Sequence, residues 1–245
     1  MSNTINLNEV SLSEGFKKIF TKILTQKTNA FGVQIGAFDG NSFDETQPIL
    51  RELRFPCLFV EPIPYYYNIM VSNLNYSDKN KFDNCAISTE DGESVMAFFD
   101  PQQFYENKPM SQEFCLTGMS SLFPIKNSPW VTPTQGITVT TKTLNTLLNT
   151  NNLFTYDIFL CDTEGHDYEI FKQVPDSAFE TCDFWKLEIQ HLDETETNQM
   201  VDRLKSNGYN VYTYHDKYPV YTDIWPAYAE HKCHDLVAIK PEILV

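Results

Sequence analysis

A short apolar run that ends in a glycine turn constrains the fold of this chain most strongly. Residues 31–35 (FGVQI) precede Gly36, and Gly40 follows after three further residues, the first of which is Ala37. A buried strand that breaks into a glycine turn before a helix has this pattern. In parallel α/β sheets, ligands bind at the carboxyl ends of strands where the strand order reverses. The stretch therefore predicts a first strand whose turn brings backbone close to a ligand.

The next predicted strand, residues 56–61 (PCLFVE), ends in a carboxylate, Glu61. An acid at the tip of the second strand is placed to accept both ribose hydroxyls of an adenosine-containing ligand. The glycines are spaced GxxxG rather than GxGxxG, which favours S-adenosylmethionine over NAD. Taken singly, the two features also fit a structural glycine turn and a solvated acid at a strand end.

A third predicted parallel strand covers residues 81–88 (KFDNCAIS). Its end would lie beside the adenine of the same ligand, because parallel strands meet at one edge of the sheet. We therefore predict that Asn84, Cys85 and Ala86 contact the edge of the adenine, partly through backbone groups.

A cluster of acids follows another buried run, residues 156–161, in the segment DTEGHD. Carboxylates placed side by side repel one another unless they meet a cation or hydrogen-bond donors. The sulfonium and ammonium groups of S-adenosylmethionine are such cations, and so is a metal ion. We predict that Asp162 binds the methionine end of this cofactor.

Five segments, in this order, resemble the FkbM family of S-adenosylmethionine-dependent methyltransferases: FGVQIGAFDGNSFD, LFVEPIPYYYNIMVSN, FDNCAIS, TLNTLL and DIFLCDTEGHDYEIF. The resemblance extends from residue 31 to residue 240. It implies an α/β, Rossmann-like class I methyltransferase fold, with a seven-stranded, mostly parallel sheet and helices on both faces. It also implies O-methylation, commonly of sugars or other hydroxyl-bearing metabolites. Gln34 stands where many methyltransferases have an acid, and we include it among the cofactor-binding residues.

The predicted fifth strand, residues 184–190, carries Glu188 and is followed by His191, an order that resembles the family's acid followed by a histidine. Methyl transfer to a hydroxyl requires alignment of the two reactants and removal of a proton. We predict that His191 is the base, that Glu188 orients it, and that Asp162 completes the catalytic set. Two alternatives stay open. Asp162, Glu188 and His191 could ligate a divalent cation, or the chain could be a non-catalytic binding protein with this fold.

Composition limits the domain count, the partners and the compartment. A chain of 245 residues with 42% hydrophobic side chains fits one methyltransferase domain, residues 1–245, with an N-terminal helix region at 1–30. A net charge of -15 argues against a nucleic-acid partner, since such proteins present a basic stripe. Neither a long apolar run nor a signal-peptide layout is present. We expect a cytoplasmic protein without membrane insertion, and we assign no metal ligands from the sequence.

Two loop segments favour a small-molecule or glycan acceptor. Residues 101–136 form a proline-rich insertion that we expect over the active site, and residues 218–234 form a second wall of the acceptor pocket. Within the insertion, Ser120 and Ser121 are candidates for cofactor or acceptor contacts. Flat aromatic faces suit the C–H surfaces of sugars, and the two segments supply Phe104, Tyr105, Phe114, Trp130, Tyr221 and Trp225.

Overall fold

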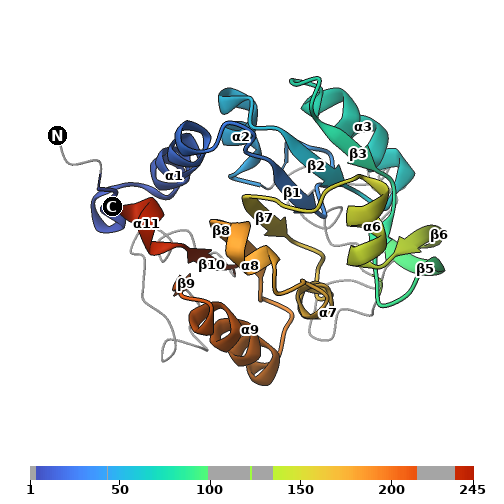
Figure 1. Ribbon diagram of the computed structural model, residues 1–245. Coiled ribbons are helices and arrows are strands. Elements are labelled where there is room, and N and C mark those ends of the chain that lie inside the picture. Colours follow the sequence, from blue (N-terminus) through green and yellow to red (C-terminus); the bar gives the residue numbers. More distant parts are fainter. Residues whose placement is uncertain (1–3, 43, 99–121, 123–134, 214–234) are drawn as a thin grey trace, which may run out of the picture.

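The computed structural model describes residues 4–42, 44–98, 122, 135–213 and 235–245 (Figure 1). Within these residues, no helix has both the length and the apolar character needed to cross a bilayer. The strands are β1 (Gly32–Ile35), β2 (Cys57–Val60), β3 (Lys81–Asp83), β4 (Ala86–Ile87), β5 (Gly92–Phe98), β6 (Gln135–Lys142), β7 (Ile158–Cys161), β8 (Phe184–Glu188), β9 (Asn210–Thr213) and β10 (Asp235–Ile239). The helices are η1 (Leu7–Glu9), α1 (Leu12–Gln26), α2 (Gln47–Leu53), α3 (Pro64–Leu74), α6 (Leu144–Thr150), α7 (Asp167–Lys172), α8 (Ala178–Thr181), α9 (Glu194–Ser206) and α11 (Pro241–Leu244).

The main sheet has seven strands in the order β3-β2-β1-β7-β8-β10-β9. All neighbours are parallel except β10, which runs antiparallel to both β8 and β9. From β1 the chain builds the sheet outward through β2 and β3, and later outward on the other side through β7 and β8. The strand order therefore reverses between β1 and β7, and the predicted seven-stranded, mostly parallel sheet is confirmed.

Helices cover both faces of this sheet, as predicted (Figure 1). Side chains alternate along each strand, so that Phe159 and Cys161 of β7 join one apolar layer while Ile158 and Leu160 join the other. The first layer packs against α6, α7, α8 and α9. The second layer packs against α1, α2, α3 and α11. Because both faces are buried, the strands read as continuous apolar runs in the sequence.

The third predicted strand is shorter than residues 81–88. β3 ends at Asp83, and Ala86 and Ile87 form β4, which pairs with β6 in a separate three-stranded sheet of order β4-β6-β5. The side-chain amide of Asn84 donates to the carbonyls of Glu61 (2.7 Å) and Pro62 (3.0 Å). This contact turns the chain out of the main sheet, and the small sheet stands beside the carboxyl end of β2.

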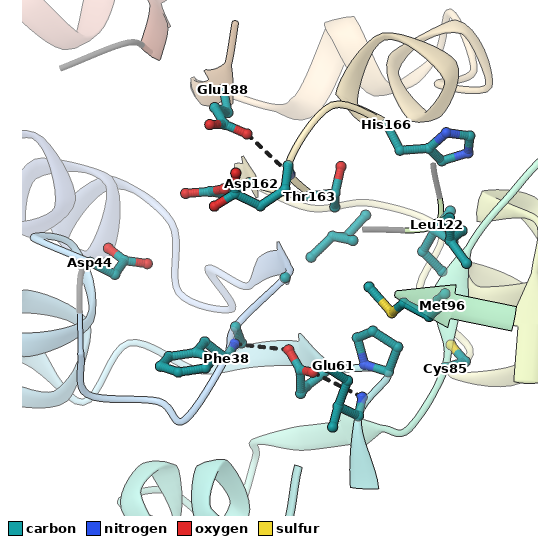
Figure 2. A pocket seen from close by; sticks show the side chains of 18 of the residues that line it. Phe38, Asp44, Glu61, Cys85, Met96, Leu122, Asp162, Thr163, His166 and Glu188 are labelled. Atoms are coloured by element: carbon teal, nitrogen blue, oxygen red, sulfur yellow. Dashed lines mark hydrogen bonds between the residues drawn. The ribbon is translucent and has the colours of Figure 1, made fainter. Parts of the chain in front are cut away.

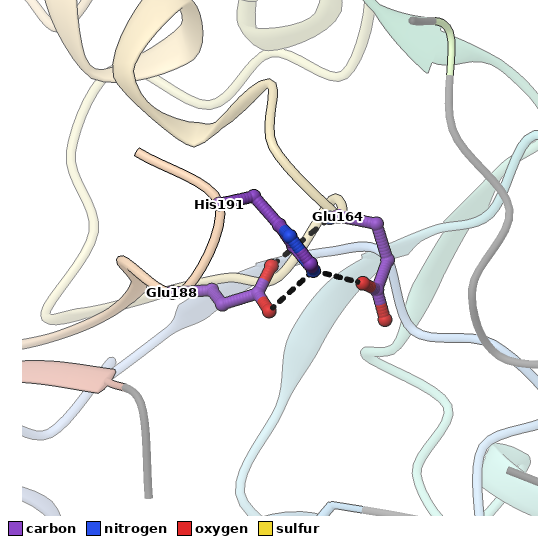
Figure 3. Close-up of side chains that lie close together, drawn as sticks. All are labelled: Glu164, Glu188 and His191. Carbon is purple, nitrogen blue, oxygen red and sulfur yellow. Dashed lines mark hydrogen bonds and ion pairs between the residues drawn. The ribbon is translucent and has the colours of Figure 1, made fainter. Parts of the chain in front are cut away.

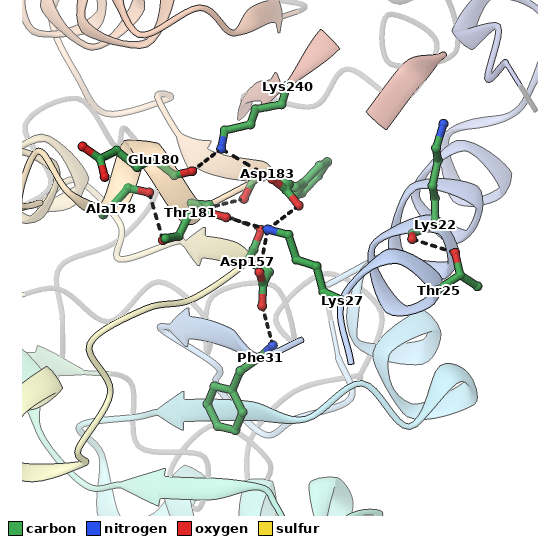
Figure 4. A network of polar contacts seen from close by, with 12 residues as sticks. Lys22, Thr25, Lys27, Phe31, Asp157, Ala178, Glu180, Thr181, Asp183 and Lys240 are labelled. Atoms are coloured by element: carbon green, nitrogen blue, oxygen red, sulfur yellow. Dashed lines mark hydrogen bonds and ion pairs between the residues drawn. The ribbon is translucent and has the colours of Figure 1, made fainter. Parts of the chain in front are cut away.

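A network of ion pairs and hydrogen bonds around Lys27 connects the amino ends of the central strands (Figure 4). The ammonium of Lys27 lies 2.7 Å from a carboxylate oxygen of Asp157 and 2.7 Å from one of Asp183, which immediately precede β7 and β8. Asp157 also accepts the backbone N–H of Phe31, at 2.8 Å, just before β1. Asp157 and Asp183, at the amino edge of the sheet, are thus each paired with a lysine.

Candidate functional site

A pocket of about 300 Å³ opens at the carboxyl edge of the main sheet, where the strand order reverses (Figure 2). Its lining comes from the ends of β1, β2, β7 and β8, from the start of the antiparallel β10, and from the small sheet. This is where a parallel α/β sheet binds its ligand. The pocket is therefore the candidate functional site.

The glycine turn after β1 forms the floor of the pocket. The backbone N–H groups of Gly36 and Ala37 both donate to the carbonyl of Val60, each at 3.0 Å, so the end of β1 is tied to β2. Gly36 has φ +78°, and a Cβ atom there would lie 1.7 Å from the carbonyl oxygen of Asp162. Only glycine therefore allows the ends of β1 and β7 to approach this closely.

Glu61 follows β2 directly and is held rigidly in the pocket wall. Its carboxylate accepts the N–H of Phe38 at 3.0 Å and the N–H of Ile63 at 2.9 Å (Figure 2). The residue is only 5% exposed. Burial raises the pKa of Glu61 to about 8, although the two amides act in the opposite direction. A buried carboxylate in this state gains from any ligand hydroxyl that donates to it.

The opposite wall is rich in carboxylates, with Asp162, Glu164 and Glu188 close together. Asp162 is exposed on the side that faces the pocket. Desolvation by the surrounding protein, followed by the charge of Glu164, raises its pKa above the usual range. Burial and then the charge of Asp162 raise the pKa of Glu188 in the same way. The described lining contains neither lysine nor arginine. This wall therefore favours a positively charged ligand group.

A buried lysine behind this wall, Lys186, forms ion pairs with other acids. The ammonium of Lys186, on β8, lies 2.9 Å from Asp235 and 3.5 Å from Glu45. Burial raises the pKa of Glu45, and the charge of Lys186 lowers it. Lys186 thus compensates Asp235 at the rim, and its charge also acts on Asp162, whose pKa it lowers against the larger upward effects of burial and Glu164.

The third wall of the pocket is apolar. Met96 of β5 and Ala86 of β4 pack with Ile63 in one small core, and Phe38 and Leu122 contact the same core. All of these residues line the pocket. This apolar surface includes Ile63, two residues after Glu61, so a ligand that has both a ring and hydroxyl groups would meet both features together.

Comparison with known families decides what kind of pocket this is. The family model for the methyltransferase FkbM domain matches residues 34–211. The chain belongs to the FkbM methyltransferase family. The matched region runs from β1 into β9 and contains Glu61, Asp162, Glu164 and Glu188, so the resemblance drawn from the five sequence segments is confirmed. Membership implies use of S-adenosylmethionine as the methyl donor.

Two solved structures resemble the chain. One is a delta-N METTL16 MTase domain, with 12% identity and a TM-score of 0.40, covering 94% of this chain and 82% of that one. The other is precorrin-6y C5,15-methyltransferase from Geobacter metallireducens GS-15, with 11% identity and a TM-score of 0.39, covering 96% of this chain and 98% of that one. No curated protein matches the chain.

The pocket of this FkbM methyltransferase brings together most of the residues predicted for the site, although they come from five different elements. Each lies at the end or the start of a strand or in the turn next to one, which is why the strand pattern could place it. The predicted residues that line the pocket are Gly36, Ala37, Glu61, Cys85, Ala86, Asp162 and Glu188.

Gln34 and Asn84 lie behind the lining and act on residues that belong to it. The amide of Gln34 donates to Asp44, whose other oxygen accepts the N–H of Thr46 at 2.7 Å, at the start of α2. Asp44 itself lines the pocket. Asn84 fixes the backbone of Glu61 through the carbonyl of that residue. Both side chains are therefore placed to position pocket residues.

Gly40 and His191 also lie outside the lining. Gly40 packs against α3, where a Cβ atom would lie 2.8 Å from the side chain of Leu74. His191 points Nε2 toward Glu164 Oε2, at 2.9 Å, and toward Glu188 Oε1, at 3.8 Å (Figure 3). His191 lies near Glu188, as the sequence order indicated, but its hydrogen bond is to Glu164, and the role of His191 as the base stays a prediction.

Sequence reasoning missed several residues of the pocket. One is Asp235, which begins β10; because β10 runs antiparallel to β8, its first residue lies beside Glu188, the last residue of β8. The sequence contains no comparable indication of the apolar wall. That wall depends on the pairing of β5 with β6, which are far apart in the chain. Apart from Leu122 and residues 135 and 136, the insertion lies outside the described residues, as do Ser120, Ser121, segment 218–234 and the six aromatic residues predicted for the acceptor.

Proposed function

We propose that this FkbM-family methyltransferase transfers the methyl group of S-adenosylmethionine to a hydroxyl of a sugar, a glycan or a related small metabolite. One observation carries the proposal: the buried carboxylate of Glu61 stands at the end of β2, in the pocket where the strand order reverses. A carboxylate in that position accepts ribose hydroxyls.

The pocket residues fit such a cofactor in chemistry. Glu61 would hold the ribose, the apolar wall with Ile63 and Met96 would cover the adenine, and Asp162 would meet the ammonium and sulfonium charges. A cationic ligand group would compensate the carboxylate wall, whose described lining contains no lysine or arginine. When bound, the cofactor supplies a methyl group that its sulfonium makes electrophilic. The protein must align the acceptor with that methyl group and remove a proton.

Replacing Glu61 with alanine tests the cofactor site. Loss of its charge-assisted hydrogen bonds should weaken the binding of S-adenosylhomocysteine by roughly 1.5 to 3 kcal/mol, measured by calorimetry. Glu90, an exposed acid outside the lining, provides the matched control, and Glu90→Ala should leave affinity unchanged. If Glu61→Ala binds S-adenosylhomocysteine as tightly as wild type does, Glu61 does not contact the cofactor. Binding of NAD, without binding of S-adenosylhomocysteine, would overturn the cofactor assignment.

Proton removal involves the carboxylates as well as His191. The sequence predicts His191 as the base, with Glu188 orienting it. In the structure Nε2 faces Glu164 and Glu188, so a proton taken from the acceptor would reach the imidazole through Glu164, which lines the pocket. An imidazole that faces two carboxylates is also the arrangement of a metal site.

The acceptor class can be tested with labelled cofactor. A net charge of -15 and a carboxylate wall disfavour polyanionic acceptors, and the aromatic segments of the sequence favour sugars. We expect label in sugars or glycans, and none in RNA, when these are screened beside small phenols and peptides. Methylation confined to peptides or RNA would contradict the sugar proposal. Cofactor binding without transfer to any class would support the non-catalytic alternative.

A further inference from the structure

Glu164, Glu188 and His191 form a compact cluster at one end of the pocket (Figure 3). Each residue offers one ligand atom, and these three atoms lie within 4.8 Å of one another. Two of the residues, Glu164 and Glu188, line the pocket. The side chains of Glu188 and His191 are each only 8% exposed. The cluster is therefore largely shielded from bulk solvent, and its Glu164 and Glu188 side chains face the pocket.

The separations within the cluster match those of ligands around one divalent ion. Ligand atoms at about 2.0 to 2.3 Å from an ion stand about 3 to 4.4 Å apart, depending on the angle between them. Nε2 of His191 lies 2.9 Å from Oε2 of Glu164 and 3.8 Å from Oε1 of Glu188. Small side-chain rotations would place an ion between all three atoms.

One oxygen of the buried Glu188 carboxylate is aimed into the cluster without a hydrogen-bond donor. Oε2 of Glu188 accepts the backbone N–H of Glu164 at 3.1 Å. Oε1 accepts no hydrogen bond from the described residues and lies 3.8 Å from Nε2 of the His191 imidazole. Lys186 on the same strand is bound to Asp235 and Glu45. Oε1 is not one of the fully buried unpartnered atoms, so a cation that enters from the pocket could bind it.

Hydrogen bonds to Asp167 fix the loop that carries Glu164. Asp167, which is fully buried at the start of α7, accepts the N–H and the hydroxyl of Thr163 (3.3 and 2.9 Å) and the N–H of Gly165 (3.4 Å). A Cβ atom on Gly165 would approach His191 to 3.1 Å. Supporting contacts of this kind fix the orientation of metal ligands.

The geometry points to a divalent cation site formed by Glu164, Glu188 and His191. Two carboxylates and one imidazole suit a first-row transition ion such as Mn²⁺ or Zn²⁺ better than Mg²⁺, which prefers oxygen ligands. Three protein ligands leave coordination positions open toward the pocket. An ion there would lower the pKa of a hydroxyl bound beside it. This role rests on the proposed function, whereas the site itself stands on its own geometry.

Binding of Mn²⁺ to the full chain tests the site. Loss of the free-ion signal in electron paramagnetic resonance should titrate to one Mn²⁺ per chain at near-physiological salt. Glu188→Gln and His191→Gln should each weaken binding by about ten-fold or more, as removal of a ligand does. Glu169→Gln removes the same charge from the surface of α7 and should bind as wild type. Pulsed measurements on the wild type should show coupling to an imidazole nitrogen, lost in His191→Gln.

Two results would overturn the site. One is the absence of saturable binding to the wild type at about 1 mM Mn²⁺. The other is equal weakening by Glu188→Gln and Glu169→Gln, which would mean diffuse attraction to an acidic protein. The nitrogen coupling is measured on wild type, so the test holds even if a variant fails to fold. Calorimetry with S-adenosylhomocysteine and no metal separates failure of this site from failure of the proposed function.

Discussion

Replacing Gly36 with alanine should destabilise the protein by at least about 4 kcal/mol and leave little folded chain. The added Cβ would stand 1.7 Å from the carbonyl oxygen of Asp162, which is backbone and cannot rotate away. Relief requires the ends of β1 and β7 to separate, and these strands pair along their whole length. A domain has about 5 to 15 kcal/mol of stability in total, so this loss is a large fraction of it.

Gly208 provides a matched control for this substitution. It has φ +85°, close to the +78° of Gly36, but a Cβ there would meet no atom within 4 Å. Gly208→Ala should therefore cost about 1 kcal/mol, the penalty of the left-handed conformation alone. Urea unfolding monitored by circular dichroism measures both variants. If Gly36→Ala unfolds at the same urea concentration as Gly208→Ala, the two strand ends do not approach as described.

Residues at the ends of strands were predictable because the relevant signals are local. Apolar runs mark the strands, and parallel strands share one carboxyl edge, so the sequence alone assigns Gly36, Glu61 and Asp162 to one pocket. The sequence order of Glu188 and His191 likewise indicated that the two side chains lie near each other.

Contacts between distant segments could not be predicted in the same way. The hydrogen bond between Glu164 and His191 depends on how the loop after β7 turns, and Glu164 turns it with φ +56°, which is uncommon outside glycine. The departure of the chain after Asp83 depends on the side chain of Asn84. An acid at a strand end has the same sequence signature whether it binds a ligand or only contacts solvent. The same is true of a glycine turn.

Stability should fall as the pH rises, because Glu61 is buried. Its pKa is about 8 in the folded protein, against 4.5 ordinarily, so the folded state holds a proton that the unfolded state has released. This contribution to stability is complete below about pH 4.5 and is lost as the pH rises through about 8. Asp39 adds to the upward shift, and the amides of Phe38 and Ile63 oppose it. Between about pH 5 and 8, we expect a loss of roughly 3 kcal/mol from Glu61.

Glu61→Gln isolates this effect from the other acids, because glutamine does not titrate. The free energies of unfolding of wild type and Glu61→Gln, from urea titrations at several pH values, should shift relative to each other by up to about 1.4 kcal/mol per pH unit, in favour of the variant as the pH rises. Glu90→Gln should show a constant difference. A constant difference for Glu61→Gln would mean that Glu61 ionises normally. Saturating S-adenosylhomocysteine should reduce the shift, since ribose hydroxyls that donate to Glu61 favour its ionised form.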